Sequence, residues 1–244
     1  MTSDPTLKGM EVIRRYVDFS TLYTEHMIPL SGGLLSNTNT SDPIGFLESP
    51  YNKKWKAETL QKEKFVLCIS HYEEDLSWLV SLSEPFVIAS KTLPTIYPNH
   101  VLSVPNTGNE VTSYLLYIIQ YYDALPEYTL FLHGHDTSWH QFYSIQYIVH
   151  VLKTSDTLGG YVNINNYLVN DRNSTTNKYM KQLSSLWLDL FETELGPMPS
   201  RFREKCCAQF VVHRSRILSH PLEFYRYLTN HPALFFDRTV SYSA

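Results

Sequence analysis

The densest cluster of reactive side chains in the sequence is the segment HGHDTSWH, residues 133–140. It places three imidazoles, one carboxylate and a Trp ring in eight positions, in a chain with only 10 His among 244 residues. Imidazoles titrate near neutral pH, bind metals and exchange protons, so the segment predicts a ligand-binding or catalytic site. For any single His, the competing interpretation is a local hydrogen bond that caps a turn.

A metal is one interpretation of this cluster. His133, His135 and Asp136 are the candidate ligands of a divalent ion, manganese or magnesium before zinc. The spacing of the His residues matches no standard zinc signature. The alternative is that the imidazoles donate hydrogen bonds to phosphate oxygens without any metal.

The elements that must position the cluster alternate between strands and helices. Residues 128–132 form a short apolar run after a Pro-containing turn, which predicts a strand that ends in the His cluster. Residues 65–70, FVLCIS, have the unbroken apolar pattern of a strand buried on both faces of a parallel sheet. A capping box at Thr107 and Glu110, followed by one apolar face, predicts a helix to about residue 122. Further strands are predicted at 86–90, 101–104, 161–164 and 206–212, and further helices at 75–80, 142–153, 180–191 and 221–228.

This alternation predicts the α/β class, with a mostly parallel sheet and helices on both faces. The sequence predicts one such domain over residues 63–244, preceded by an N-terminal extension of helix and loop over residues 1–62. Residues 165–178, rich in Asn, Ser and Thr, predict a mobile loop near the mouth of the site. In open α/β sheets, ligands bind beyond the carboxyl ends of the strands, where the His cluster is expected to lie.

Composition excludes several classes of partner. The net charge of −4 and the absence of a basic run argue against nucleic acid or an anionic membrane surface as a partner. No long apolar stretch and no signal-peptide pattern is present, so we expect a soluble, cytoplasmic protein without a membrane span. Three Cys make neither a disulfide framework nor a CxxC metal site, and free buried thiols are predicted.

Three blocks of the sequence resemble a known family. They are CISHYEEDLSWL, VPNTGNEVTSYLLYIIQYYDALPEYTLFLHGHDTSWH and CCAQFVVHRSRILSHPLEFYRYL, and together they resemble the DUF3431 family over residues 64–230. The motifs of that family are similar to those of GT-A glycosyltransferases, with the His-rich element where those enzymes carry Asp-x-Asp. The resemblance implies a GT-A-like, Rossmann-like domain. It also implies transfer of a sugar from a UDP- or GDP-linked donor to a glycan or another hydroxyl acceptor.

This implied reaction suggests roles for individual residues. Asp136 and His135 are the candidate catalytic residues, because transfer to a hydroxyl needs a base within reach. Candidate contacts to the nucleotide donor come from strand ends and from the turn before a helix: Ser70, His71, Glu73, Glu74, Lys91, Asn106 and Asn109. Candidate contacts to the sugar or acceptor are Trp139, His140 and Gln209. Gln209 interrupts an apolar strand, so it either satisfies a backbone group or faces the site.

Two other functions remain open. The main alternative is a pseudo-enzyme that binds carbohydrate or nucleotide without turnover, which the missing Asp-x-Asp favours. A metal-dependent hydrolase built on the His cluster is the third interpretation. Because imidazoles suit zinc, nickel or copper better than magnesium, we expect transferase activity to survive EDTA.

Overall fold

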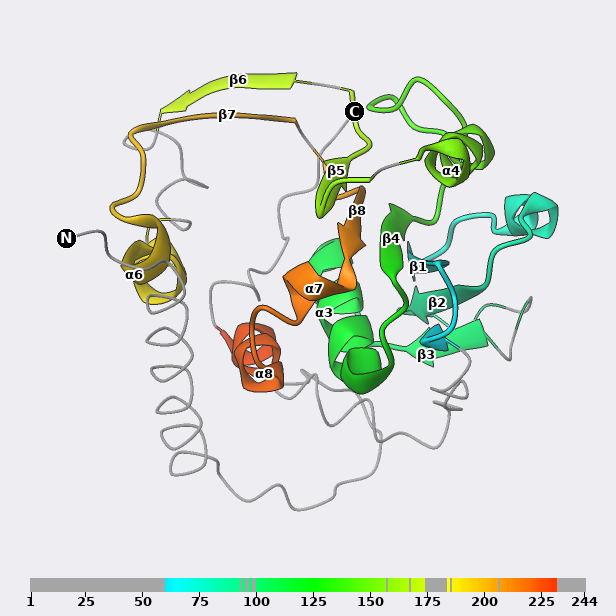
Figure 1. The fold of residues 1–244 in the computed structure, drawn as a ribbon, viewed down its shortest axis with the longest axis horizontal. Coiled ribbons are helices and arrows are strands. Elements are labelled where there is room, and N and C mark those ends of the chain that lie inside the picture. Colours follow the sequence, from blue (N-terminus) through cyan, green and yellow to red (C-terminus); the bar gives the residue numbers. More distant parts are fainter. Residues whose placement is uncertain are drawn as a thin grey trace, which may run out of the picture.

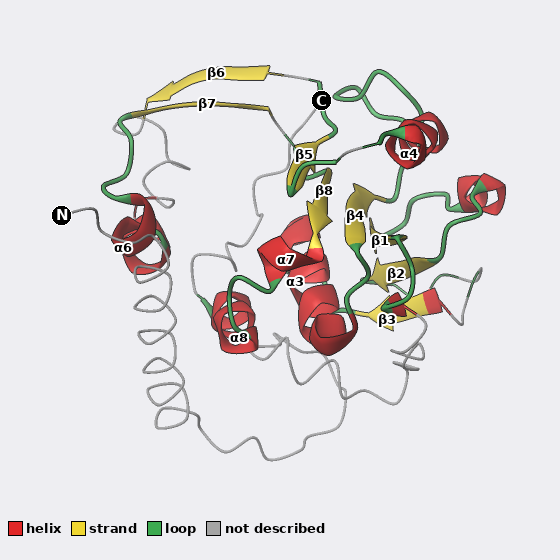
Figure 2. Ribbon diagram, viewed as in Figure 1, coloured by secondary structure: helices red, strands yellow, loops and turns green. Residues whose placement is uncertain are grey.

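The computed structural model describes residues 60–92, 94, 97, 100–156, 158–166, 168–173, 184, 186–205 and 207–231. The predicted N-terminal extension therefore lies outside the described residues, apart from its last three positions. The described part of the chain forms a six-stranded sheet with helices on both faces and a separate two-stranded sheet (Figures 1 and 2).

The large sheet is mostly parallel, as predicted. Its strands are β1 (Phe65–His71), β2 (Phe86–Ser90), β3 (Val101–Ser103), β4 (Tyr128–His133), β5 (Tyr161–Asn163) and β8 (Phe210–His213), and their order is β3-β2-β1-β4-β8-β5. The strands β1 to β4 pair in parallel, and β8 lies antiparallel between β4 and β5, which makes the sheet mixed. Because the chain enters β1 and β4 from the same end, the segments that follow these two strands meet at one edge.

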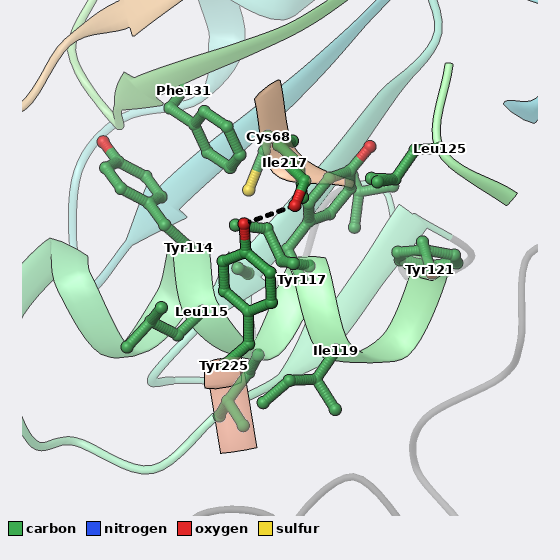
Figure 3. Packing of buried hydrophobic residues seen from close by; sticks show 14 of the residues in the cluster. Cys68, Tyr114, Leu115, Tyr117, Ile119, Tyr121, Leu125, Phe131, Ile217 and Tyr225 are labelled. Carbon is green, nitrogen blue, oxygen red and sulfur yellow. Dashed lines mark hydrogen bonds between the residues drawn. The ribbon is translucent and has the colours of Figure 1, made fainter. Parts of the chain in front are cut away.

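Helices cover the two faces of this sheet with separate apolar clusters. On one face lie α3 (Asn109–Tyr121), the 3-10 helix η4 (Tyr122–Ala124), α7 (Arg214–Ile217) and α8 (Leu222–Asn230). There Cys68 and Phe131 pack with Tyr117, and the Tyr225 hydroxyl donates to the Ile217 carbonyl at 2.7 Å (Figure 3). On the other face, η2 (Ser77–Ser81) and α4 (Ile145–Thr154) cover the alternate side chains of β1 and β4. All seven residues of β1 are buried, which confirms the prediction of a strand covered on both faces.

The helix predicted after residue 107 is α3, but its capping box does not form. Gly108 is the N-cap residue, with a φ of 59°, and no side chain caps the helix. Asn109 also has a positive φ, 51°, so the chain turns sharply before the helix begins. That turn directs the Glu110 carboxylate toward the end of β4 instead of back to Thr107.

Other elements depart from the sequence predictions. The helix predicted at 75–80 is the 3-10 helix η2, which follows an Asp75 side chain that accepts the Ser77 N–H at 2.9 Å. Residues 168–173, predicted as loop, are the strand β6 (Leu168–Asn173), which pairs antiparallel with β7 (Arg201–Lys205). The predicted helix at 180–191 is described only at residues 184 and 186–191, and α6 (Glu192–Leu195) follows it before Gly196.

The cysteines divide into two chemical states. Cys68 is free and buried, and burial raises the pKa of its thiol well above the ordinary value. Cys207 is disulfide-bonded, so the prediction of free thiols is wrong for this residue. None of the helices in the described part of the chain is both long and apolar enough to cross a bilayer.

Candidate functional site

The candidate site lies at the carboxyl ends of β1 and β4. Ser70 of β1 is the register partner of His133 of β4, so the two strands end side by side. The strands β2 and β3 lie on one side of this pair and β8 and β5 on the other. The strand order therefore reverses here, which is where open α/β sheets form a ligand-binding crevice.

A carboxylate and an imidazole face each other across this edge. Oε1 of Glu74, which follows β1, lies 3.9 Å from Nε2 of His135, which follows β4. The other carboxylate oxygen accepts the Tyr72 N–H at 2.7 Å. Burial raises the pKa of Glu74, but backbone N–H groups and the imidazoles of His135 and His71 lower it more, so the net pKa lies below the ordinary value. Glu74 is therefore ionised at neutral pH.

Gly134 allows this close approach. A Cβ atom at Gly134 would lie 2.8 to 2.9 Å from side-chain atoms of Glu74. On its other side, the Gly134 carbonyl accepts the Trp78 indole N–H at 2.9 Å. The space that a side chain at residue 134 would fill is occupied by the Glu74 side chain.

A second carboxylate and imidazole lie behind the first pair. Nε2 of His133 is 3.8 Å from Oε1 of Glu110, and the side chain of His133 is only 15% exposed. The ring of His140 lies edge-on to that of His133, with centroids 5.4 Å apart. Burial lowers the pKa of both imidazoles below the ordinary value, although Glu110 acts in the opposite direction on each. Both rings are therefore neutral near pH 7.

Gln209 supports the end of β4 from inside the protein. Its side chain is fully buried, accepts the His133 N–H at 3.2 Å and donates to Oε1 of Gln141 at 2.7 Å. Gln141 in turn donates to the Asp136 carbonyl at 2.7 Å. Of the two roles considered for Gln209, the structure shows the backbone-satisfying one.

Asp136 is used to start α4. Its Oδ1 atom accepts the Ile145 N–H at 3.1 Å, so the carboxylate is engaged with the start of the helix. The three predicted metal ligands consequently do not converge. Throughout the part of the chain that the structure describes, no three His, Cys, Asp or Glu side chains are grouped so that they could hold a metal ion.

The predicted donor-binding residues divide into buried supports and exposed groups. Ser70 donates to Ser113 at 2.9 Å, and His71 contacts the Ser90 hydroxyl at 2.8 Å and the Glu74 carbonyl at 3.2 Å. These buried contacts fix the end of β1 and the loop that carries Glu74. Glu73 and Asn106 are exposed at the same edge of the sheet.

Lys91, which follows β2, reaches the first turn of α3. Its ammonium group donates to the Asn109 carbonyl at 2.6 Å, which brings a cation to the first turn of the helix. Glu110 in that turn was missed as a site residue because its spacing from Thr107 fits a capping box. One signal in the sequence could have identified Glu110 as a site residue: it lies at the start of a helix that leads from one parallel strand to the next.

Trp139 and His140 lie in the loop before α4, which begins at Ile145. Trp139 is 75% exposed, whereas His140 is buried and contacts the Ser138 hydroxyl. Of the three predicted sugar-binding residues, only Trp139 presents most of its surface to solvent.

A separate apolar cavity of about 300 Å³ lies on the α3 face, away from these groups. Its wall includes Val111, Tyr114, Leu115, Ile118, Phe131, Ala208, Phe210, Val212, Arg216, Ile217 and Tyr225. None of the predicted site residues lines it. Cavity and candidate site are therefore independent features of the described chain.

Comparisons with known proteins point to one family. A family model described as "Protein of unknown function (DUF3431)" matches residues 66–233, which include both strand ends of the candidate site. No curated protein and no solved structure matches the chain.

Proposed function

This chain belongs to the DUF3431 family, and we propose that it is a glycosyltransferase-like enzyme of GT-A type, which moves a sugar from a nucleotide donor to a hydroxyl acceptor. The observation that carries the proposal is the Glu74–His135 pair at the point where the strand order reverses. A carboxylate and an imidazole in contact at a ligand-binding edge are suited to removing the proton of a hydroxyl.

The nucleotide is proposed to bind along the ends of β1 and β2. The parallel order β3-β2-β1-β4 is the arrangement that dinucleotide-binding sheets use, with the ligand in the crevice at the reversal. The start of α3 opens onto this edge with Lys91, which supplies positive charge for a diphosphate. Glu73, exposed beyond β1, is free to accept hydrogen bonds from ribose hydroxyls.

The transfer step then follows from the two side chains. The side chain of His135 is 53% exposed and reaches solvent, whereas that of Glu74 is 22% exposed and ionised. His135 takes the proton of the acceptor hydroxyl, and Glu74 stabilises the resulting imidazolium. The acceptor oxygen bonds to the anomeric carbon while the bond to the diphosphate oxygen breaks, and its electron pair leaves with the nucleoside diphosphate. Asp136, the base suggested by the sequence, is engaged with α4 instead.

The proposal is tested with a panel of UDP- and GDP-sugars. We expect UDP or GDP at millimolar concentration to raise Tm, since a ligand of the native state stabilises it. We also expect one sugar nucleotide to release its nucleoside diphosphate, with and without EDTA. Glu74→Gln should lower that release at least about tenfold, roughly 1.4 kcal/mol. The matched control is Glu194→Gln, which neutralises an exposed carboxylate of α6 that has no part in the proposed site and should leave the release step within about threefold of wild type.

The second candidate function is the binding of a carbohydrate or nucleotide without turnover. It is favoured by the engagement of Asp136 with α4 and by the neutral, buried state of His133. A thermal shift with UDP or GDP but no release from any sugar nucleotide supports this alternative. No thermal shift with any nucleoside diphosphate, with or without manganese, contradicts the transferase proposal and the nucleotide-binding form of the alternative.

A further inference from the structure

The loop that carries His135 continues into an exposed aromatic surface. Trp139, Phe142, Tyr143 and Tyr147 are 75%, 81%, 57% and 50% exposed, and Val151 one turn further along α4 is 42% exposed. We call these five residues the aromatic strip. Large apolar side chains scattered singly are ordinary on a protein surface, but a contiguous group marks a binding surface.

The aromatic strip is not part of the core. Ile145, Val149 and Leu152 are the residues of α4 that pack on the sheet, so the helix is already anchored by its other side. Within the strip, the rings of Tyr143 and Tyr147 lie 4.7 Å apart at 37°, which makes one broad platform. Both rings keep at least half of their surface exposed. Packing therefore does not account for these aromatic residues.

The aromatic strip is continuous with the candidate site. The ring of Trp139 lies edge-on to that of His140, with centroids 5.3 Å apart, and the ring of His140 contacts that of His133. His135 lies four residues before Trp139 on the same loop. A chain-like ligand with one end at His135 thus has an aromatic surface along which to extend.

The charge of this region identifies the ligand class. Residues 137–152 contain no Asp, Glu, Lys or Arg, and Lys153 just beyond them is paired with Glu84. A neutral aromatic surface does not recognise an acidic polymer or an anionic membrane, both of which require basic side chains. Pyranose rings, by contrast, present apolar C–H faces that stack on aromatic rings and hydroxyl edges that bond to polar neighbours. Exposed Gln146 and His150 supply such neighbours on α4.

We infer that the acceptor is a neutral oligosaccharide of several pyranose units, which lies along the aromatic strip with its reactive hydroxyl at His135. This inference rests on the proposed transferase function and specifies its acceptor. An acceptor held this way binds more tightly as it lengthens, because each added unit covers another ring.

The test uses neutral oligosaccharide ladders of one to six units, built from glucose, mannose or N-acetylglucosamine. Binding to the full-length protein is measured by calorimetry. We expect the affinity for at least one ladder to rise with length. Trp139→Ala and Phe142→Ala should each lower the affinity for the longest member at least fivefold. The matched control is Tyr161→Ala, because Tyr161 is 56% exposed but its ring packs against Phe210, on the α3 face of the sheet.

Release of nucleoside diphosphate in the absence of an acceptor is measured on the same variants, which separates the two proposals. Release that persists in the strip variants while no ladder binds in a length-dependent way overturns this inference and leaves the transferase proposal standing. Ladder binding that depends on Trp139, in a protein on which no nucleotide has an effect, overturns the transferase proposal. It leaves the aromatic strip as a glycan-binding surface. Dimerisation, or binding to phosphatidylcholine vesicles, that Phe142→Ser abolishes without any ladder binding assigns the strip to another partner and overturns the inference.

Discussion

Glu74 is held in place by groups from three segments of the chain. The Tyr72 N–H bonds its carboxylate, the His71 imidazole contacts its carbonyl, and its side chain lies against the backbone of Gly134. The Trp78 indole fixes Gly134 from the other side. The position of the proposed active carboxylate therefore depends on the absence of a side chain at residue 134.

The first prediction concerns this Gly. Gly134→Ala places a Cβ atom within 2.9 Å of Glu74, so the carboxylate and its loop must move. We expect nucleoside diphosphate release to fall at least about tenfold and the free energy of unfolding to fall by about 1–3 kcal/mol. Gly159→Ala is the control, because the nearest atom to a Cβ there is 3.6 Å away. Equal release by the two Ala variants would show that the Glu74 position does not matter.

The second prediction concerns pH. Burial holds the pKa of His133 and His140 below their ordinary value near 6.5, with Glu110, His135 and Glu74 as the ionisable groups near this pair. Below that pH the unfolded chain binds protons that the folded chain does not, so stability falls as pH falls. We expect Tm to be lower at pH 5.5 than at pH 7.5.

To assign this pH dependence to His140, the variant His140→Asn is compared with the control His150→Asn, because His150 is exposed on α4. The change in Tm between pH 7.5 and 5.5 should shrink in His140→Asn and stay as in wild type in His150→Asn. If His140→Asn keeps the full wild-type pH dependence, the buried ring of His140 does not contribute to it.

At the scale of elements, one buried amide joins four parts of the fold. Gln209, next to β8, bonds the backbone at the end of β4 and the Gln141 side chain of the loop before α4. Asn165, which follows β5, donates to the Gln209 carbonyl at 2.8 Å. These bonds replace water where β4 leaves the sheet, and they fix the direction in which the His-rich loop departs.

The third prediction follows from this connection. Gln209→Leu leaves the His133 N–H without this partner inside the protein, whereas Oε1 of Gln141 keeps its hydrogen bond from the Ser138 hydroxyl. An unsatisfied buried group costs about 1–3 kcal/mol, so we expect the free energy of unfolding to fall by about 1–3 kcal/mol in urea denaturation. Gln146→Leu, at an exposed position of α4, should change it by less than about 0.5 kcal/mol. Equal stability of the two variants would contradict the structural role of Gln209.

The sequence predicted the elements whose pattern reflects burial and missed those that depend on partners far away in the chain. Residues 65–70 are apolar because both faces are covered, and this pattern is visible locally. The strand β7, RFREK, carries four charged residues and is a strand only because β6 pairs with it. Glu110 matched a local capping motif, and the two positive φ angles at the start of α3 turn it toward His133. The location of the site at the ends of β1 and β4 could therefore be predicted from the sequence, whereas the contribution of Glu110 from α3 could not.

At the scale of the whole molecule, the described chain carries a polar edge and an apolar cavity in different places. Charged and polar groups gather at the carboxyl edge, around Glu74 and His133, whereas the cavity on the α3 face is apolar apart from Arg216. Apolar pockets with few polar groups are a common kind of small-molecule site. Only the carboxyl edge places an ionised carboxylate next to an exposed imidazole. The transferase proposal therefore requires the nucleotide to bind at the carboxyl edge. The apolar cavity is the alternative place for a ligand.

The fourth prediction decides between these two places by amide hydrogen exchange on the whole protein, with and without UDP or GDP. Without ligand, β1 and β4 should exchange slowest because both faces of each are covered, and the two-stranded β6–β7 sheet should exchange faster. A nucleotide bound at the strand ends should slow exchange in residues 72–75 and 106–110, which follow β1 and precede α3. Exchange in α8, which lines the cavity through Tyr225, should not change. Slowing confined to α7 and α8 would place the ligand in the apolar cavity and remove the Glu74–His135 pair from the reaction.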